Sequence, residues 1–327
     1  MKTGYLPLRS FKYNIQMGKR AVITGAFSFT GAAVAAELIH RGWKVHTLTN
    51  RSLPPEAGEI TSSPLKFESS YLQEQLKDAD VFINTYWVRI PWNGTTFQTG
   101  IDNSKLLVQA AVEAKVPRFV HVSVSRAEKG MNLGYYRGKH EVENLVINSG
   151  LSYGIVCPTL ALGPNDVLTN NIAWFLRRFP FFPIPKGGHF RLQPVTLNDM
   201  GRIIADAAES KENMKVDAAG PEILSYRDFL THLAQACGVK PIFVSAPNWL
   251  ALAGIRLIEP LVGDVILTRE ELLGLQQELL CSDKPPLGKE STVEWLKQNG
   301  NRLGRVYAND VKRHFGSDSS KPVIPKW

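Results

Sequence analysis

The sequence has few cysteines, and they lack the spacing of a metal site or a disulfide framework. Cys157, Cys237 and Cys281 are the three cysteines, far apart and with no CxxC or Cys/His pairing. Zinc sites and disulfide-stabilised scaffolds need closer, patterned cysteines. We therefore expect buried thiols in a reducing compartment and no metal site.

Long apolar runs are also missing. A membrane-spanning helix needs about 20 apolar residues, and no uncharged stretch of that length occurs, which predicts a soluble, cytoplasmic protein. Residues 1–20 contain five basic and no acidic residues, so an organelle-targeting N-terminus stays open. They lack the apolar core of a secretory signal, and we expect residues 1–18 to be a flexible extension.

Acidic residues are in the minority. The chain has 38 Lys and Arg against 30 Asp and Glu, a net charge of +8 over 327 residues. This excess favours anionic ligands such as a phosphorylated cofactor or acidic lipid headgroups. The basic residues are scattered and form no concentrated stripe, so no nucleic-acid partner is expected.

Short apolar runs alternate with helical patterns through the first half of the chain. The expected strands are residues 20–24, 45–49, 65–67, 80–85, 118–123 and 152–157, and the expected helices are 32–40, 72–77, 103–114 and 135–149. Alternation at this spacing produces βαβ units with helices on both faces of a parallel sheet. The predicted fold class is α/β, a Rossmann-type doubly wound parallel sheet.

The pattern loosens in the second half, where a smaller, mostly helical C-terminal substrate region is expected. Residues 192–196 predict a late strand before a helix at Asp199, and Ser225 and Asp228 have capping-box spacing for a helix to Cys237. Further helices are expected at 249–258, 269–279 and 292–298. The expected division is a dinucleotide-binding domain at 19–165, with sheet and helix returning at about 192–222, a substrate region at 166–191 and 223–316, and a tail at 317–327.

A glycine-containing turn occurs where the first strand becomes a helix. It comprises Thr24, Gly25, Ala26, Phe27, Ser28, Phe29, Thr30 and Gly31. Gly25 would permit a tight turn, Gly31 would let helix and strand approach closely, and the N–H groups at the helix start would hold a pyrophosphate. The alternative is a plain βα turn that happens to contain glycines.

The end of the second strand bears on the choice of cofactor. A carboxylate there would bond the adenosine ribose and favour NAD, but this chain has Thr49, Asn50 and Arg51. The Arg51 guanidinium suits a phosphate, so NADP is preferred and NAD remains an alternative. Arg51 could instead be a solvated loop cation.

Tyr135 and Lys139 are four residues apart and would share one face of a helix. The ammonium would lower the pKa of the phenol and reach a cofactor ribose, so Tyr135 could act as a general acid and base. The same spacing also arises by chance, and the adjacent Tyr136 could be a packing aromatic.

Together, residues 20–208 resemble extended and atypical short-chain dehydrogenases/reductases, the NAD-dependent epimerase/dehydratase superfamily. The family pattern TGxxGxxG occurs here with Ser28 at the middle glycine, and its YxxxK motif matches Tyr135 and Lys139. RGKHEVE at 137–143 and GDVILTREEL at 263–272 are most similar to the NmrA-like, complex-I-accessory-subunit-like branch.

The resemblance implies roles for further residues. A serine after the fifth strand would orient the substrate oxygen, and Ser123 and Ser125 are both candidates. Lys139 would also hold the cofactor ribose. The other residues implied to line the cofactor are Asn84, Thr85, Tyr86, Pro158 and Thr159.

Residues 170–192 are rich in aromatic side chains interleaved with basic ones. The aromatics are Trp174, Phe175, Phe179, Phe181, Phe182 and Phe190. Over the nicotinamide they would suit a small apolar or aromatic carbonyl or hydroxyl substrate, although they could equally form the core of the smaller region. Residues 249–258 could dock on a membrane surface or on another subunit.

Two functions therefore fit the sequence. The first is an NADP-dependent oxidoreductase, or an epimerase or dehydratase, in which Tyr135 exchanges a proton with the substrate as hydride moves to or from the nicotinamide. The second is a non-catalytic NAD(P)-binding accessory, assembly or sensor protein. Peripheral membrane or protein-complex association and the oligomeric state stay open.

Overall fold

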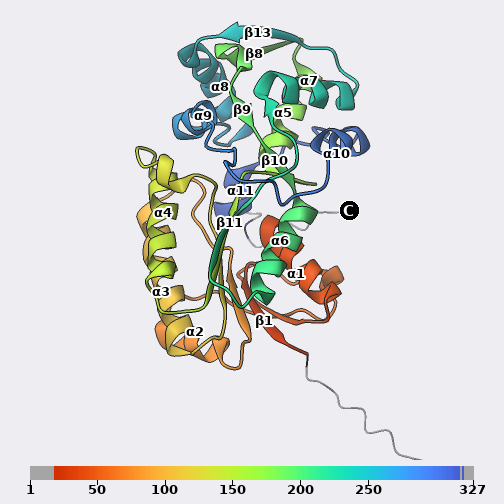
Figure 1. Ribbon diagram of the computed structural model, residues 1–327. Coiled ribbons are helices and arrows are strands. Elements are labelled where there is room, and N and C mark those ends of the chain that lie inside the picture. Colours follow the sequence, from red (N-terminus) through yellow and green to blue (C-terminus); the bar gives the residue numbers. More distant parts are fainter. Residues whose placement is uncertain (1–17, 317–318, 320–327) are drawn as a thin grey trace, which may run out of the picture.

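The computed structural model describes residues 18–316 and 319, and its centre is a seven-stranded parallel sheet (Figure 1). The strand order is β11-β6-β5-β4-β1-β2-β3, and every neighbouring pair is parallel. The strands are β1 (Arg20–Thr24), β2 (Lys44–Leu48), β3 (Thr61–Ser63), β4 (Val81–Asn84), β5 (Phe119–Val122), β6 (Tyr153–Pro158) and β11 (Met214–Ala218).

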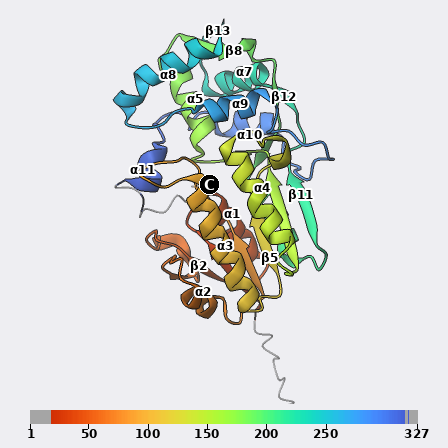
Figure 2. The ribbon, with the colours of Figure 1, turned by 90° about the vertical axis from the view of Figure 1, so that its left-hand side faces the viewer.

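Helices cover both faces of this sheet (Figures 1 and 2). The helices are α1 (Phe29–His40) and α6 (Leu197–Glu209) on one face and α2 (Ser69–Leu76), α3 (Phe97–Glu113) and α4 (Gly134–Ile147) on the other. One core includes Ile23, Val34 and Ile204, and a second core includes Phe82 and Leu107. Because both faces are covered, β4 and β5 are buried at every position. The predicted Rossmann-type doubly wound sheet is confirmed.

One predicted strand is wrong. The third strand was expected at residues 65–67, but β3 occupies Thr61–Ser63, where Thr61 pairs with His46 of β2. Leu65 and Phe67 are partly buried and pack against the core that α2 and α3 share. An edge strand with polar, largely exposed residues has no apolar pattern to reveal it, so the pattern marked the wrong segment.

After β6 the chain builds a smaller, mostly helical lobe. Its helices are α5 (Val167–Arg178), α7 (Tyr226–Cys237), α8 (Asn248–Val262), α9 (Arg269–Gln276), α10 (Thr292–Asn299) and α11 (Asp310–Phe315). Its strand pairs are β7 (Leu160–Leu162) with β10 (Pro194–Thr196), β8 (Phe181–Pro185) with β13 (Ile242–Ala246), and β9 (Arg191–Leu192) with β12 (Leu224–Ser225). Short 3₁₀ turns lie at Pro55–Ala57, Ala127–Lys129 and Lys186–Gly188.

Local capping explains where several of these helices begin. Ser225 Oγ accepts a hydrogen bond from the Asp228 N–H at 3.0 Å, as its spacing predicted, and α7 follows. Thr196 does the same for α6 by accepting from the Asp199 N–H. The chain then returns through α6 to β11, so the larger lobe is completed by residues that follow part of the smaller one.

The carboxyl ends of the central strands face the smaller lobe (Figure 1). Within residues 18–316, no helix combines the length and apolar character needed to cross a bilayer. The expected extension at 1–18 and tail at 317–327 lie outside the described residues, apart from Gly18 and Ser319.

Candidate functional site

A cavity of about 1060 Å³ lies between the ends of the central strands and the smaller lobe. Thr24, Thr85 and Ser123 line it from the sheet, and Phe175 and Leu272 line it from the lobe. Open α/β sheets bind ligands at the carboxyl ends of their strands. The volume is at the upper end of the range of about 300–1,000 Å³ for ligand pockets.

The glycine turn closes one side of this cavity. Gly25 has φ +72°, a conformation that favours glycine. A Cβ atom on Gly31 would lie 2.1 Å from the carbonyl oxygen of Gly25, so only glycine allows α1 to pack this closely on the turn. The Ser28 hydroxyl donates to the Gly25 oxygen at 2.6 Å. This serine therefore stabilises the turn.

Most of the turn residues predicted to bind cofactor reach the cavity. Those that line it are Thr24, Gly25, Ser28, Phe29 and Thr30. Phe27 is 1% exposed and lies in the protein interior, and Gly31 acts through the close approach already described. The first N–H groups of a helix have no acceptor within it, so the positive end of the α1 dipole lies at the cavity.

Hydrogen bonds join the ends of β1 and β4 beside this turn. Thr24 Oγ1 accepts from the backbone N–H groups of Thr85 at 2.8 Å and Tyr86 at 3.1 Å. It donates to Asn84 Oδ1 at 3.2 Å. Thr85 and Tyr86 line the cavity. Asn84 is fully buried and contributes through its hydrogen bond with Thr24.

Two arginines lie at the cavity end beside β2. Arg51 lines the cavity and donates through Nη2 to the Arg313 carbonyl oxygen at 2.9 Å. Arg313 also lines the cavity, and the pKa of Arg51 is lowered by burial and then by the charge of Arg313. Asn50 also lines the cavity and exchanges hydrogen bonds with the backbone of Leu65. This end therefore has two cations, Arg51 and Arg313, with the carboxylate of Asp310 close to both.

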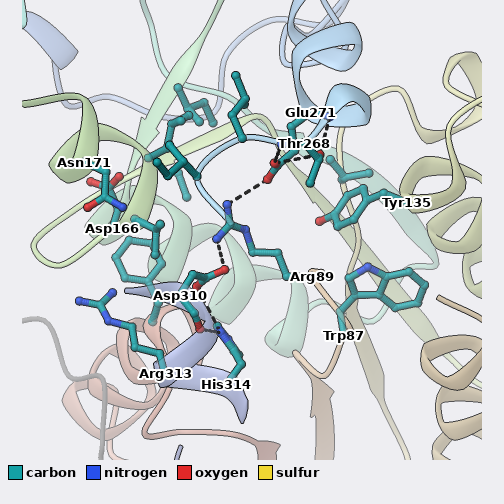
Figure 3. Close-up of a pocket in the computed structure, with 18 of the residues that line it drawn as sticks. Trp87, Arg89, Tyr135, Asp166, Asn171, Thr268, Glu271, Asp310, Arg313 and His314 are labelled. Atoms are coloured by element: carbon teal, nitrogen blue, oxygen red, sulfur yellow. Dashed lines mark hydrogen bonds and ion pairs between the residues drawn. The ribbon is translucent and has the colours of Figure 1, made fainter. Parts of the chain in front are cut away.

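Tyr135 and Lys139 line the opposite end of the cavity from helix α4. Lys139 Nζ donates to the Val122 carbonyl oxygen at 2.8 Å and lies 4.7 Å from the centre of the Trp87 ring. Burial lowers the pKa of Lys139 to about 7, although the negative charge of Glu143 acts to raise it. In Figure 3 the Tyr135 hydroxyl points into the cavity.

The expectation that Lys139 lowers the pKa of Tyr135 is wrong. Burial raises the pKa of this phenol to about 12, and the cation that opposes the rise is Arg89. The tyrosine ring packs edge-on against Trp87 and Phe97, with centroid distances of 6.1 and 6.0 Å. These rings exclude water from the phenol, which explains the direction of the shift.

The structure separates the two candidate serines. Ser123 lines the cavity, and its buried hydroxyl has no hydrogen-bond partner among residues 18–316. Ser125 is fully buried and donates to the Leu279 carbonyl oxygen at 2.6 Å. Ser125 therefore joins the two lobes, and Ser123 keeps a hydroxyl available to a ligand.

Pro158 and Thr159 line the cavity as the resemblance implied. Thr159 Oγ1 donates to the Gln193 carbonyl oxygen, and its N–H donates to the Ala218 carbonyl oxygen at 3.0 Å. The side chain of Thr159 is thus committed to joining β6 to the returning chain. Its contribution to the cavity is one of shape.

A charged network that the sequence pattern does not reveal crosses the cavity (Figure 3). Arg89 follows β4 and donates to Glu271 of α9 at 3.0 Å and to Asp310 of α11. Asp310 also pairs with His314 at 3.2 Å. Arg89 precedes its two acidic partners by 182 and 221 residues, so no local spacing could have revealed them.

The pKa of Asp310 gives a testable pH dependence. Burial raises it, but the charges of Arg89 and His314 outweigh burial and hold it at about 2. A carboxyl pKa below its unfolded value of about 3.9 stabilises the fold above that value, and the stabilisation is lost as the pH falls towards 2. We expect Asp310→Asn to lower the free energy of unfolding by about 2 kcal/mol at pH 7.

The measurement is urea unfolding of the wild type and Asp310→Asn at pH 7 and pH 3. The difference between the two proteins should shrink at the lower pH. An equal difference at both pH values would mean that the carboxylate charge is not what stabilises this contact. Asp206→Asn, which alters a carboxylate more than half exposed, is the control and should change little.

Most of the predicted aromatic wall lies in the cavity. The aromatic residues of 170–192 that line it are Phe175, Phe179, Phe181, Phe182 and Phe190. Phe190 also belongs to the core of the smaller lobe, so the two interpretations of this segment both hold in part. Arg177 donates to backbone carbonyls at 237, 300 and 303 and is structural.

The fold and this cavity define a Rossmann-type protein with the architecture of the NAD-dependent epimerases and dehydratases. The chain belongs to the NmrA-like family, which it matches over residues 17–247. The resemblance inferred from the sequence is confirmed.

Two curated relatives match at low identity. The mitochondrial NADH dehydrogenase [ubiquinone] 1 alpha subcomplex subunit 9 of Arabidopsis thaliana is 21% identical over an alignment of 287 residues that covers 80% of this chain and 71% of that protein. The photosystem II assembly factor Ycf39 of Cyanidium caldarium is 22% identical over 191 residues, 57% of this chain and 60% of that protein.

Solved structures share the fold at still lower identity. The NAD-dependent NDP-hexosamine 5,6-dehydratase TunA superposes with a TM-score of 0.63 at 16% identity, covering 89% of this chain and all of that one. The UDP-glucuronic acid 4-epimerase from Bacillus cereus, solved in complex with NAD, has a TM-score of 0.61 at 17% identity, covering 85% and 96%.

Proposed function

We propose that this protein is an NADP-dependent oxidoreductase of the short-chain dehydrogenase/reductase superfamily, acting on a small apolar or aromatic carbonyl or hydroxyl compound. One observation carries the proposal: Tyr135, Lys139 and the partnerless Ser123 hydroxyl line the same cavity as the start of α1. An unsatisfied buried hydroxyl is costly unless a ligand completes it.

The residues present fit a dinucleotide. Gly31 leaves no room for a Cβ atom, and the start of α1 offers N–H donors to a pyrophosphate. Lys139 would orient the ribose beside the nicotinamide, and Arg51 and Arg313 would bind a phosphate on the adenosine ribose. When bound, the nicotinamide supplies or accepts hydride.

The chain's own residues would then handle the substrate oxygen. The Ser123 hydroxyl would donate a hydrogen bond to it, and the Tyr135 phenol would give it a proton in reduction or take one in oxidation. A hydrogen bond to the substrate oxygen would orient the phenol for this exchange, and Arg89 is the cation that favours its ionised form. Trp87 and Phe97 would keep water from this exchange.

The substrate class follows from the remaining wall. Beyond Tyr135 the cavity is lined by phenylalanines and by aliphatic residues such as Ile255 and Leu275. Arg89 already forms ion pairs with two carboxylates, so its charge does not require an anionic substrate. An apolar or aromatic carbonyl compound satisfies this lining better than a sugar nucleotide.

The test begins with calorimetric titration of NADPH and NADH, and continues with the nicotinamide absorbance of NADPH in the presence of aliphatic aldehydes, aromatic ketones and quinones. The proposal expects tighter binding of NADPH and its oxidation with at least one class. Binding of neither dinucleotide would overturn it.

A second candidate is a non-catalytic NAD(P)-binding accessory or assembly protein. The curated relatives are named as a complex subunit and an assembly factor, which favours association with a protein complex. The raised pKa of Tyr135 also favours it, because a phenol with a pKa of about 12 exchanges protons poorly at neutral pH. Firm NADPH binding without turnover would support this candidate.

The choice of cofactor can be tested at Arg51. We expect Arg51→Gln to raise the Kd for NADPH by about 10- to 100-fold and to change that for NADH little, because it removes a charge-assisted hydrogen bond to phosphate. Calorimetry on both dinucleotides measures this. The exposed Arg137→Gln removes the same charge elsewhere and should leave both affinities unchanged. Equal losses for NADPH and NADH would contradict a phosphate contact.

A further inference from the structure

Helix α8 is apolar around most of its circumference and yet lies on the surface. Trp249, Leu250, Leu257 and Leu261 are 69%, 48%, 78% and 84% exposed. Of the residues of α8, only Ala251 is buried. A helix of this composition is normally covered on all sides. Single exposed leucines are common, but a cluster of this kind marks an interaction site.

The exposed apolar surface continues onto the adjoining strands. Strand β13 leads into α8 and pairs with β8, so that Ile242 lies beside Phe181. We call the combined surface the apolar cap. It consists of the exposed side chains of Phe179, Phe181, Ile242, Val244, Trp249, Leu250, Leu257 and Leu261. Figure 1 places β8, β13 and α8 together at the end of the molecule farthest from the start of β1.

The charges within the cap segments are almost all positive. Residues 178–186 and 240–262 contain the exposed cations Arg178, Lys186, Lys240 and Arg256. Their one acidic residue is Glu259, which is half-buried and accepts from the Ile266 N–H at 3.1 Å. An apolar surface carrying cations without exposed acids is complementary to anionic lipid headgroups.

The inner side of the same helix belongs to the cavity. Ala251, Gly254, Ile255 and Ile258 line it, so α8 is a single-helix wall between the apolar cavity and the apolar cap. Leucines with a tryptophan and basic residues are typical of helices in the membrane interface. The composition therefore favours a bilayer over a protein partner.

We infer that the apolar cap docks on the surface of an anionic lipid bilayer, with α8 lying in the interface and the cavity behind it taking a lipophilic carbonyl or quinone substrate from the membrane. The docking step stands on the cap alone, and the substrate step rests on the proposed function. Each of the four cations near the surface would add to the attraction, so docking should weaken with salt.

The test uses the full chain and vesicle flotation. The probes are vesicles of phosphatidylcholine mixed with the anionic lipid phosphatidylglycerol, and vesicles of phosphatidylcholine alone. We expect the protein to float with the anionic vesicles, at least 10-fold less with the neutral ones, and to be released by high salt. Leu257→Glu with Leu261→Glu should reduce flotation by at least 10-fold.

A matched variant controls for the added charge. Val112→Glu with Ile147→Glu replaces two exposed apolar residues of α3 and α4 and should float as the wild type does. NADPH titration of both double variants should give the wild-type Kd, which also shows that they fold. That titration separates membrane docking from the proposed function. A variant that no longer floats but still binds NADPH has lost docking alone.

Three results would overturn the inference. The first is a wild-type protein that stays in solution with both vesicle types. The second is flotation that the α8 variant and the control variant lose equally. The third is a concentration-dependent dimer, seen by sedimentation, that the α8 variant abolishes, which would assign the cap to a second copy of this chain.

Discussion

Tyr135→Phe is expected to lower kcat for NADPH-dependent carbonyl reduction by about 10²- to 10⁴-fold, the usual contribution of a positioned general acid. The substitution removes only the hydroxyl that points into the cavity. The ring would keep its contacts with Trp87 and Phe97. The affinity for NADPH should therefore stay within about 2-fold of the wild type, because the Tyr135 hydroxyl is expected to act on the substrate in the transition state and not in cofactor binding.

Tyr136→Phe is the matched control, because the two tyrosines are adjacent on α4 and the centroids of their rings are 5.4 Å apart. The Tyr136 ring also packs against Gly274 of the smaller lobe, and we expect less than about a 3-fold change in kcat, as for a contact outside the chemistry. Steady-state kinetics at several pH values measures both variants. If both lose activity equally, the loss reflects packing of the aromatic cluster.

Gly31→Val is expected to weaken dinucleotide binding by at least 10-fold and to destabilise the protein. The new side chain would begin 2.1 Å from the Gly25 oxygen and 2.7 Å from the Gly25 carbonyl carbon. Both atoms belong to the backbone of a turn that also bonds β2 through the Gly25 N–H, at 2.8 Å from the Leu48 oxygen. Overpacking of this kind costs about 1–3 kcal/mol, and it would move the start of α1 away from the pyrophosphate.

Ala36→Val introduces the same residue on the exposed side of α1 and separates this steric effect from the lower helix propensity of valine. Calorimetry with NADPH and urea unfolding measure both variants. The expected pattern is at least a 10-fold loss of affinity, about 1.4 kcal/mol, at Gly31 and little change at Ala36. Normal NADPH binding by Gly31→Val would show that α1 does not bind the cofactor.

Local sequence patterns located the parts of the site that depend on short spacing. The turn at 24–31 and the Tyr135/Lys139 pair each fit within one element or one connection, and both line the cavity. The parallel sheet was predictable for the same reason, since each βαβ unit is compact in sequence. The catalytic and cofactor-binding roles of these residues stay predictions.

What escaped prediction depends on contacts between distant segments. The carbonyl oxygen of Leu279 accepts a hydrogen bond from Ser125, which precedes it by 154 residues, and leaves the Ser123 hydroxyl without a partner among the described residues. No local pattern could show which serine forms this bond. The pKa of Tyr135 depends on the rings around it and on Arg89 in the same way. Strand β3 was misplaced for a different reason, because its exposed residues carry no burial pattern.

The segment that identifies the family ends before the site is complete. Residues 17–247 match the NmrA-like family, but Glu271, Asp310 and Arg313 come later in the chain and line the cavity. A fragment cut at the family boundary would keep the glycine turn and lose these partners of Arg89 and Arg51. Proteins that share this segment can therefore differ in the cavity residues that follow it, with no change to the glycine turn.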